Sequence, residues 1–102
     1  MIIKVKTKKE LLEYLKTNNK IVIDFYAEWC QPCQMQGVIL DQVAKINSNY
    51  QFLKVDTTSL DGTTLSMFHI VSIPTIIIFN NQREIKRFIG LTNKHDLIKT
   101  LK

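Results

Sequence analysis

One stretch of the sequence decides the fold, and it reads Ile21-Val22-Ile23-Asp24-Phe25-Tyr26-Ala27-Glu28-Trp29-Cys30-Gln31-Pro32-Cys33. Positions 21–26 are β-branched or aromatic apart from Asp24, which predicts a central strand covered by helices on both sides. Pro32 stands where a helix can begin, because the first helical turn has no use for its missing N–H. The stretch therefore places Cys30 and Cys33 between a buried strand and the N-terminus of a helix.

The pattern on either side of this stretch predicts further elements. Strands are expected at 1–6, 52–56, 75–79 and 84–89, and helices after Thr7, near Asp61 and after Asn93. A turn at 80–81 joins the last two strands as a hairpin. The resulting order is βαβαβαββα, which predicts an α/β fold with a mixed central β-sheet flanked by helices on both faces.

Side chains of the helix after the cysteines are expected to fill part of the core. The helix after the cysteines should bury one stripe, made of Met35, Val38, Ile39, Gln42, Val43 and Ile46. Met35 and Met67 are interpreted as core filler rather than as functional residues. His69 and His95 lie far from the cysteines along the chain, and we assign them no ligand role.

Size and composition predict the broad class of protein. The 102 residues are expected to form one domain, residues 1–102. The net charge of +5 comes from scattered lysines and arginines, so we expect no nucleic-acid partner. The longest apolar run, 76–79, is far short of the roughly 18 residues of a membrane span, and the N-terminus lacks a secretory-signal pattern. We therefore expect a cytoplasmic monomer with no membrane partner.

The two cysteines favour redox chemistry. A secreted disulfide scaffold normally carries more cysteines, and a structural zinc site needs four ligands, although a metal shared by two copies of the chain stays open. The N-terminus of a helix favours a thiolate, so Cys30 is the predicted nucleophile. Cys33 follows one turn later and is the predicted resolving thiol, which closes a Cys30–Cys33 disulfide. We expect no metal.

Residues 24–33 closely resemble the active-site segment of the thioredoxin family. The segments Ser72-Ile73-Pro74-Thr75 and Phe88-Ile89-Gly90 resemble the family's cis-proline segment and its late glycine, so the resemblance covers essentially the whole chain. It implies a thioredoxin fold and a protein-disulfide reductase that acts as an electron carrier. It also implies that no cofactor is bound, that electrons arrive from NADPH through a flavin thioredoxin reductase, and that disulfide-containing proteins are the targets.

The same resemblance implies roles for individual residues. Asp24 is expected to assist proton transfer at the inner cysteine. Trp29, Ile73, Pro74 and Gly90 are expected to border the substrate, with Pro74 in the cis form so that the Ile73 backbone pairs with an extended segment. Gln31 and Pro32, which separate the cysteines, complete the expected substrate-binding residues.

The sequence also departs from the family pattern. Gln31 replaces the usual glycine but adds no charge that would stabilise the thiolate, so a reductant is preferred to a disulfide oxidant or isomerase. Phe52 stands where some relatives have a lysine near the buried aspartate, and without that lysine we expect a higher pKa for Asp24. A redox-inert adaptor is the least favoured interpretation, because a binding module would not need the cysteine pair, Asp24 and Pro74 together.

Overall fold

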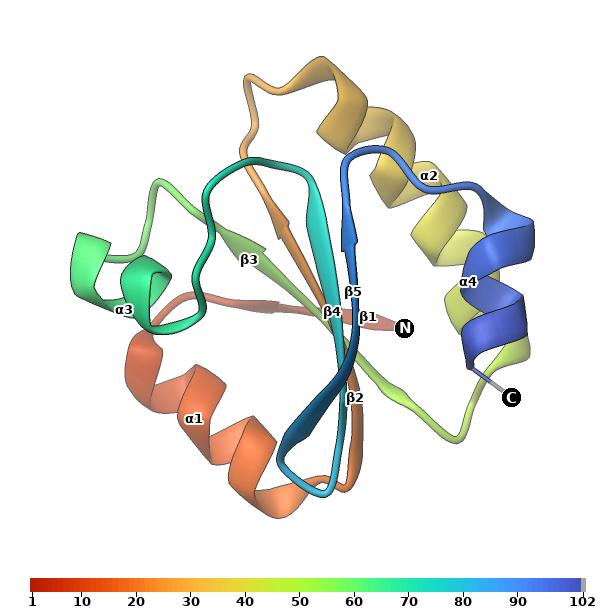
Figure 1. The fold of residues 1–102 in the computed structure, drawn as a ribbon, viewed down its shortest axis with the longest axis horizontal. Coiled ribbons are helices and arrows are strands. Elements are labelled where there is room, and N and C mark those ends of the chain that lie inside the picture. The colour runs from red at the N-terminus through yellow and green to blue at the C-terminus, as the bar shows by residue number, and fades with distance from the viewer. Residues whose placement is uncertain (102) are drawn as a thin grey trace.

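The computed structural model describes residues 1–101 and shows a five-stranded sheet with helices on both faces (Figure 1). The elements follow in the predicted order βαβαβαββα. They are β1 (Ile2–Val5), α1 (Lys8–Thr17), β2 (Lys20–Tyr26), α2 (Gln31–Ile46), β3 (Gln51–Asp56), α3 (Gly62–Met67), β4 (Thr75–Asn80), β5 (Arg83–Ile89) and α4 (Lys94–Thr100). Helices α1 and α3 cover one face of the sheet, and α2 and α4 cover the other.

The strand order in the sheet is β1-β3-β2-β4-β5, which confirms the predicted mixed sheet. Strands β1, β3 and β2 run parallel, whereas β4 is antiparallel to β2 and β5 is antiparallel to β4. Strand β2 is therefore central, and residues 21–26 are all buried. This position explains why both faces of β2 are apolar, because each faces a layer of helices.

Most helices begin at a side chain that accepts a backbone N–H. Thr7 is the N-cap residue of α1 and accepts the N–H of Glu10 at 3.1 Å, and the Glu10 carboxylate accepts the N–H of Lys6 at 3.0 Å. Asp61 and Asn93 begin α3 and α4 in the same way. These local signals fix where the chain turns from strand to helix. No helix within residues 1–101 has the length and apolar character needed to cross a membrane.

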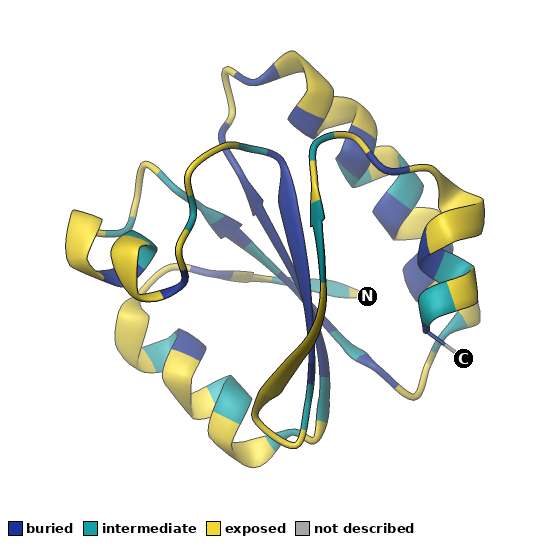
Figure 2. Ribbon diagram, viewed as in Figure 1, coloured by how far each residue is buried: buried dark blue, intermediate teal, exposed yellow. Residues whose placement is uncertain are grey.

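The core consists of a layer on each face of the sheet, visible as the dark blue segments of Figure 2. The predicted stripe on α2 was largely wrong, because Met35, Val38 and Ile46 are all more than half exposed. The buried positions of this helix are Cys33, Gln36, Leu40, Val43 and Ala44. Since Cys33 turns toward the sheet, helical periodicity buries the positions three, seven and ten residues after it. Met67 is also exposed, so neither methionine fills the core.

Candidate active site

The two cysteines form a disulfide at the start of α2. Cys30 is the N-cap residue of the helix, and its Sγ accepts the backbone N–H of Cys33 at 3.2 Å. The Cα atoms are 5.2 Å apart, within the usual range for a disulfide. Cys30 is 6% exposed and Cys33 is 2% exposed, so the outer position of Cys30 is retained by a small margin. The Cys33 N–H points at the Cys30 sulfur, and the N-terminus of the helix favours negative charge there.

The proline segment packs against this disulfide. The Ile73–Pro74 peptide bond is cis, as the resemblance implied. Ile73 contacts the buried cluster formed by Tyr26, Ala27, Cys30 and Cys33. The Thr75 hydroxyl donates to the Ser72 carbonyl at 2.6 Å, which ties the two ends of this short segment together.

The glycine segment lies beside the proline. The Gly90 N–H donates to the Pro74 carbonyl at 2.8 Å. Gly90 has a φ of +90°, a conformation that side chains rarely adopt, so the end of β5 requires glycine here. Three segments that are distant in sequence thus meet at one end of the sheet, namely the disulfide, the proline segment and the glycine segment.

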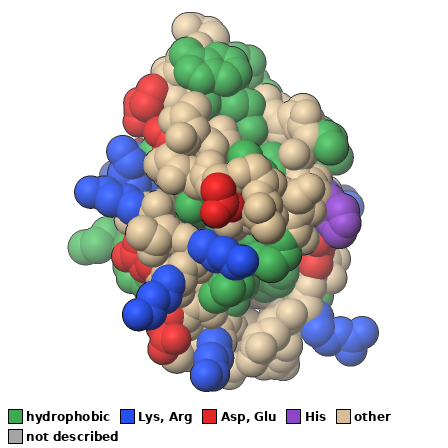
Figure 3. Space-filling model, turned by 90° about the vertical axis from the view of Figure 1, so that its left-hand side faces the viewer, with side chains coloured by type: hydrophobic (Ala, Val, Ile, Leu, Met, Phe, Trp, Pro, Cys, Tyr) green, Lys and Arg blue, Asp and Glu red, His purple; other side chains and the backbone are tan. Residues whose placement is uncertain are grey.

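The rim of this region is apolar and exposed. Trp29 is 75% exposed and Val71 is 88% exposed, although large apolar residues usually pack inside. Gln31 and Pro32 are exposed between the cysteines, whereas Pro74 is buried. Figure 3 shows hydrophobic side chains gathered at the upper end of the face it presents, the end at which Figure 1 places the start of α2. This end of the molecule therefore exposes apolar surface to solvent.

Asp24 is a buried carboxyl group behind the disulfide. It is 2% exposed, and its Oδ1 atom has no hydrogen-bond partner within residues 1–101. Burial raises the pKa of Asp24 to about 7, and the positive charge of Lys54 acts in the opposite direction. Asp24, Cys33 and Lys54 line one cavity of about 80 Å³, which is large enough to admit water. The carboxyl group can therefore gain or lose a proton near neutral pH beside the inner cysteine.

The expected rise in the pKa of Asp24 is found, although Asp24 does have a lysine neighbour at another position. Phe52 is buried in the core and is paired with Val22, not with Asp24. The residue paired with Asp24 on β3 is Lys54, two positions later. Lys54 could have been identified from the sequence only if the pairing register of β2 and β3 had been known.

Sequence reasoning also missed Gln36, which is fully buried one turn after Cys33. Its Oε1 accepts the N–H of Thr92 at 2.8 Å, and its Nε2 donates to the Thr92 carbonyl at 3.1 Å. Position 36 carries one weak signal in the sequence, because it lies three residues after Cys33 on the helix face that turns inward. The amide therefore joins α2 to the loop that follows Gly90.

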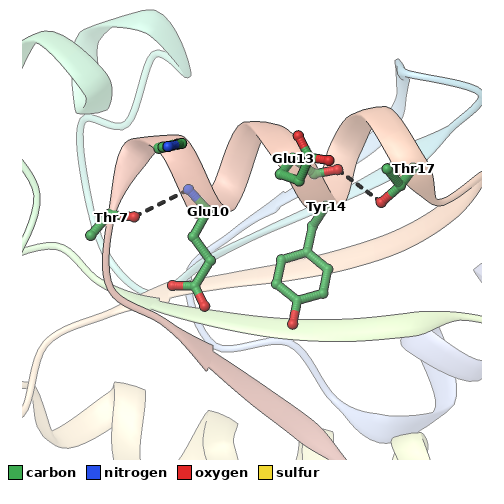
Figure 4. A pocket seen from close by; sticks show the side chains of 6 residues that line it. Thr7, Glu10, Glu13, Tyr14 and Thr17 are labelled. Atoms are coloured by element: carbon green, nitrogen blue, oxygen red, sulfur yellow. Dashed lines mark hydrogen bonds between the residues drawn. The ribbon is translucent and has the colours of Figure 1, made fainter.

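Other surfaces of the described chain carry no comparable chemistry. A hollow of about 470 Å³ runs along α1 (Figure 4), where Thr7 and Thr17 bond to their own helix. No three His, Cys, Asp or Glu side chains within residues 1–101 cluster as metal ligands would. Figure 3 shows basic side chains interspersed with acidic ones, in agreement with the scattered charge of the sequence.

Comparisons with known proteins agree with this site. The family model described as Thioredoxin matches residues 2–102. A thioredoxin of Mycoplasmoides gallisepticum is 39% identical over 98 residues, which cover 96% of this chain and 97% of the relative. The oxidised mitochondrial thioredoxin 3 of Saccharomyces cerevisiae superposes with a TM-score of 0.87 at 29% identity and covers 98% of this chain and 92% of its own.

A further relative has a longer chain. It is the bifunctional thioredoxin reductase/thioredoxin of Mycobacterium leprae, 30% identical over 89 residues. The match covers 87% of this chain but only 19% of that protein.

Proposed function

Since this chain belongs to the thioredoxin family and is a thiol–disulfide oxidoreductase, we propose that it acts mainly as a reductant of protein disulfides. The observation that carries the proposal is the Cys30–Cys33 disulfide at the N-terminus of α2, beside the cis Pro74. The oxidised pair is the product state of such a reductant. Its reduced form holds the two electrons that a target disulfide accepts.

The proposed reaction has two exchange steps. The Cys30 thiolate attacks one sulfur of a target disulfide and bonds to it, and the other target sulfur leaves as a thiolate that takes up the proton given up when Cys30 ionised. The Cys33 thiolate then attacks the Sγ of Cys30, which releases the second target thiol and closes the Cys30–Cys33 disulfide. Two electrons and two protons pass from the dithiol to the target, so the balance needs no bound cofactor.

Cys30 is proposed as the nucleophile because of its place in α2. Its sulfur caps the helix by accepting the Cys33 N–H, and this hydrogen bond is stronger with a thiolate than with a thiol. Cys33 is less exposed, so a large target meets Cys30 first.

Asp24 is proposed to move the proton of Cys33. A resolving thiol must lose its proton before it attacks, and a base with a pKa near the working pH does this best. Asp24 meets the requirement because its pKa is raised to about 7 and it shares a cavity with Cys33. Room for water in that cavity supports a proton path that does not need direct contact.

The exposed rim is proposed to bind the target. Trp29 supplies apolar surface, and Gln31 and Pro32 lie next to it between the cysteines. The backbone of Ile73 makes no hydrogen bond in the turns and loops of residues 1–101, so its peptide groups are available to an extended segment. Gly90 lies beside Pro74 and leaves open space, because a Cβ built there meets nothing within 4 Å.

The source of electrons is proposed to be a flavin thioredoxin reductase that uses NADPH. The Mycobacterium leprae relative carries both names in one chain, which supports a functional partnership between the two activities. We further propose that residues 1–102 form one domain that works as a cytoplasmic monomer in electron transport and redox homeostasis.

The redox potential of the Cys30/Cys33 pair tests the proposed direction. Equilibration with glutathione and dithiothreitol is expected to give a value near the roughly −270 mV known for thioredoxin. Insulin reduction with dithiothreitol as the electron source should proceed with the native chain and stop with Cys30→Ser. Cys33→Ser should instead accumulate a mixed disulfide. A potential near roughly −120 to −180 mV would instead indicate an oxidant or isomerase.

A further inference from the structure

The buried amide of Gln36 has no part in the exchange steps described above. Glutamine is seldom fully buried, because a polar side chain removed from water loses free energy unless it is hydrogen-bonded. Here both amide atoms are bonded, and both partners belong to the backbone of Thr92, 56 positions away. We propose that Gln36 is a positioning residue that holds the 90–92 loop against the dithiol helix, so that protein substrates, unlike small disulfides, find a preformed docking edge.

The chemistry of the side chain fits this task. A primary amide offers an acceptor and a donor side by side, so it can pair with the N–H and the carbonyl of one residue, as a neighbouring strand would. A carboxylate at position 36 could accept the N–H but could not donate to the carbonyl. The pairing is short, at 2.8 and 3.1 Å, and Thr92 is itself only 8% exposed. The bonds are therefore shielded from competition by water.

The loop is held from two directions. At one end, the Gly90 N–H donates to the Pro74 carbonyl, and the Thr92 hydroxyl donates to the Gly90 carbonyl at 3.0 Å. At the other end, Thr92 is fixed by Gln36 one helical turn after Cys33. A continuous set of hydrogen bonds thus joins the proline segment, the loop and the dithiol helix. Leu91 is 45% exposed within the held segment and presents its side chain to solvent.

The consequence differs between classes of substrate. The inference rests on the proposed function, in which a target protein contacts the rim around Gly90 as well as the sulfur of Cys30. A target of this kind loses affinity when the loop must be ordered at the moment of binding. A small aromatic disulfide needs access to the Cys30 sulfur alone, so the order of the loop does not affect its reaction.

The test compares two variants of the full chain. Gln36→Met has a similar volume and removes both hydrogen bonds. Val43→Ala is the matched control, because it also alters a fully buried position of α2 but lies on the half of the helix remote from the cysteines. The Michaelis constant for insulin, kcat/KM for a small aromatic disulfide and the redox potential of the dithiol are measured for each.

With Gln36→Met the Michaelis constant for insulin should rise about three- to tenfold, the factor expected from losing one or two ordinary hydrogen bonds. The rate with the small disulfide and the potential should stay within about twofold of the native values, and Val43→Ala should change none of the three. The proposal is overturned if the Michaelis constant for insulin is unchanged, or if the reactions with insulin and with the small disulfide slow by the same factor. If the native chain itself fails to reduce insulin, the proposed function fails first.

Amide hydrogen exchange gives a second measurement, which does not depend on the folding of a variant. In the native oxidised chain the Thr92 N–H should exchange at least about tenfold more slowly than the N–H of exposed Leu91, because only the former is held by Gln36. Equally fast exchange at the two positions would show that the hydrogen bonds between Gln36 and Thr92 are not formed in solution.

Discussion

Two buried polar side chains flank the inner cysteine, and they differ in how far their hydrogen bonds are satisfied. Asp24 on β2 lies behind Cys33, and its Oδ1 atom lacks a partner within residues 1–101. Gln36 on α2 is bonded through both amide atoms. A buried carboxylate without a hydrogen-bond partner is poorly stabilised, so its protonated and ionised forms have similar free energies near neutral pH. A hydrogen-bonded amide does not titrate in this range, and any other conformation would lose its two hydrogen bonds. The strand side therefore suits chemistry, and the helix side suits rigidity.

The largest expected effect is a pH-dependent difference in the free energy of unfolding between the Asp24→Asn variant and the native chain. A carboxyl whose pKa rises from 3.8 to about 7 on folding favours the folded state less as the pH increases between these values, because the unfolded chain loses its proton first. The loss reaches about 4 kcal/mol above pH 7. The variant lacks this term, so its stability relative to the native chain should increase by about 4 kcal/mol between about pH 4 and pH 8.

Urea unfolding of the oxidised proteins at a series of pH values measures this difference directly. Subtracting the native curve from the variant curve cancels the other carboxyl groups. A difference that stays constant with pH would show that the pKa of Asp24 is not raised, and the contrast between the two sides of the cysteine would disappear.

The next effect concerns the rate of resolution. If Asp24 accepts the proton of Cys33, Asp24→Asn should slow release of the second target thiol by about 100-fold near pH 7, a typical contribution of a general base. The native rate should rise through an inflection near pH 7, where Asp24 ionises, and the variant should lack it. Single-turnover release from a chromogenic disulfide gives both profiles. Equal rates at pH 7 would remove Asp24 from the proton path.

On the helix side, Gln36→Met is expected to decrease the stability of the protein. Gln36→Met leaves the N–H and the carbonyl of Thr92 buried without a partner, which should lower the free energy of unfolding by about 2 kcal/mol. The loss should be the same at every pH, because no group at position 36 titrates. The urea series used for Asp24→Asn measures it. A loss that varies with pH, or a gain in stability, would mean that the amide is not the satisfied group described here.

The features predicted correctly from the sequence depend on local patterns. The buried strand at 21–26, the cysteine pair and the start of α2 lie within a few residues of one another. The caps at Thr7, Asp61 and Asn93 are also local, since each side chain bonds to an N–H three residues ahead. The assignment of the cis bond depended on resemblance instead, because cis is rare even before proline.

The features that were missed depend on how separate segments align. Lys54 lies beside Asp24 only because β2 and β3 pair in one register, and a change of one residue would turn Lys54 to the other face. Gln36 meets Thr92 only after both sheet and helix are in place. The error at Met35 and Val38 has a local cause: the polar Gln36 interrupts the buried stripe of α2, so a neighbouring stripe of the helix looks more apolar.

The smallest expected effect concerns Lys54→Met, which removes the positive charge that opposes the pKa rise of Asp24. The inflection of the native rate profile should move to higher pH, by an amount equivalent to at most about 1 kcal/mol, because Lys54 is only partly buried. Lys86→Met is the matched control: both lysines lie on strands above an aromatic ring, Tyr26 at 5.5 Å and Phe88 at 5.3 Å. Lys86 pairs with Ile78, so its loss should leave the inflection in place. A shift of equal size in both variants would mean that Asp24 responds to the net charge of the protein and not to its neighbour on β3.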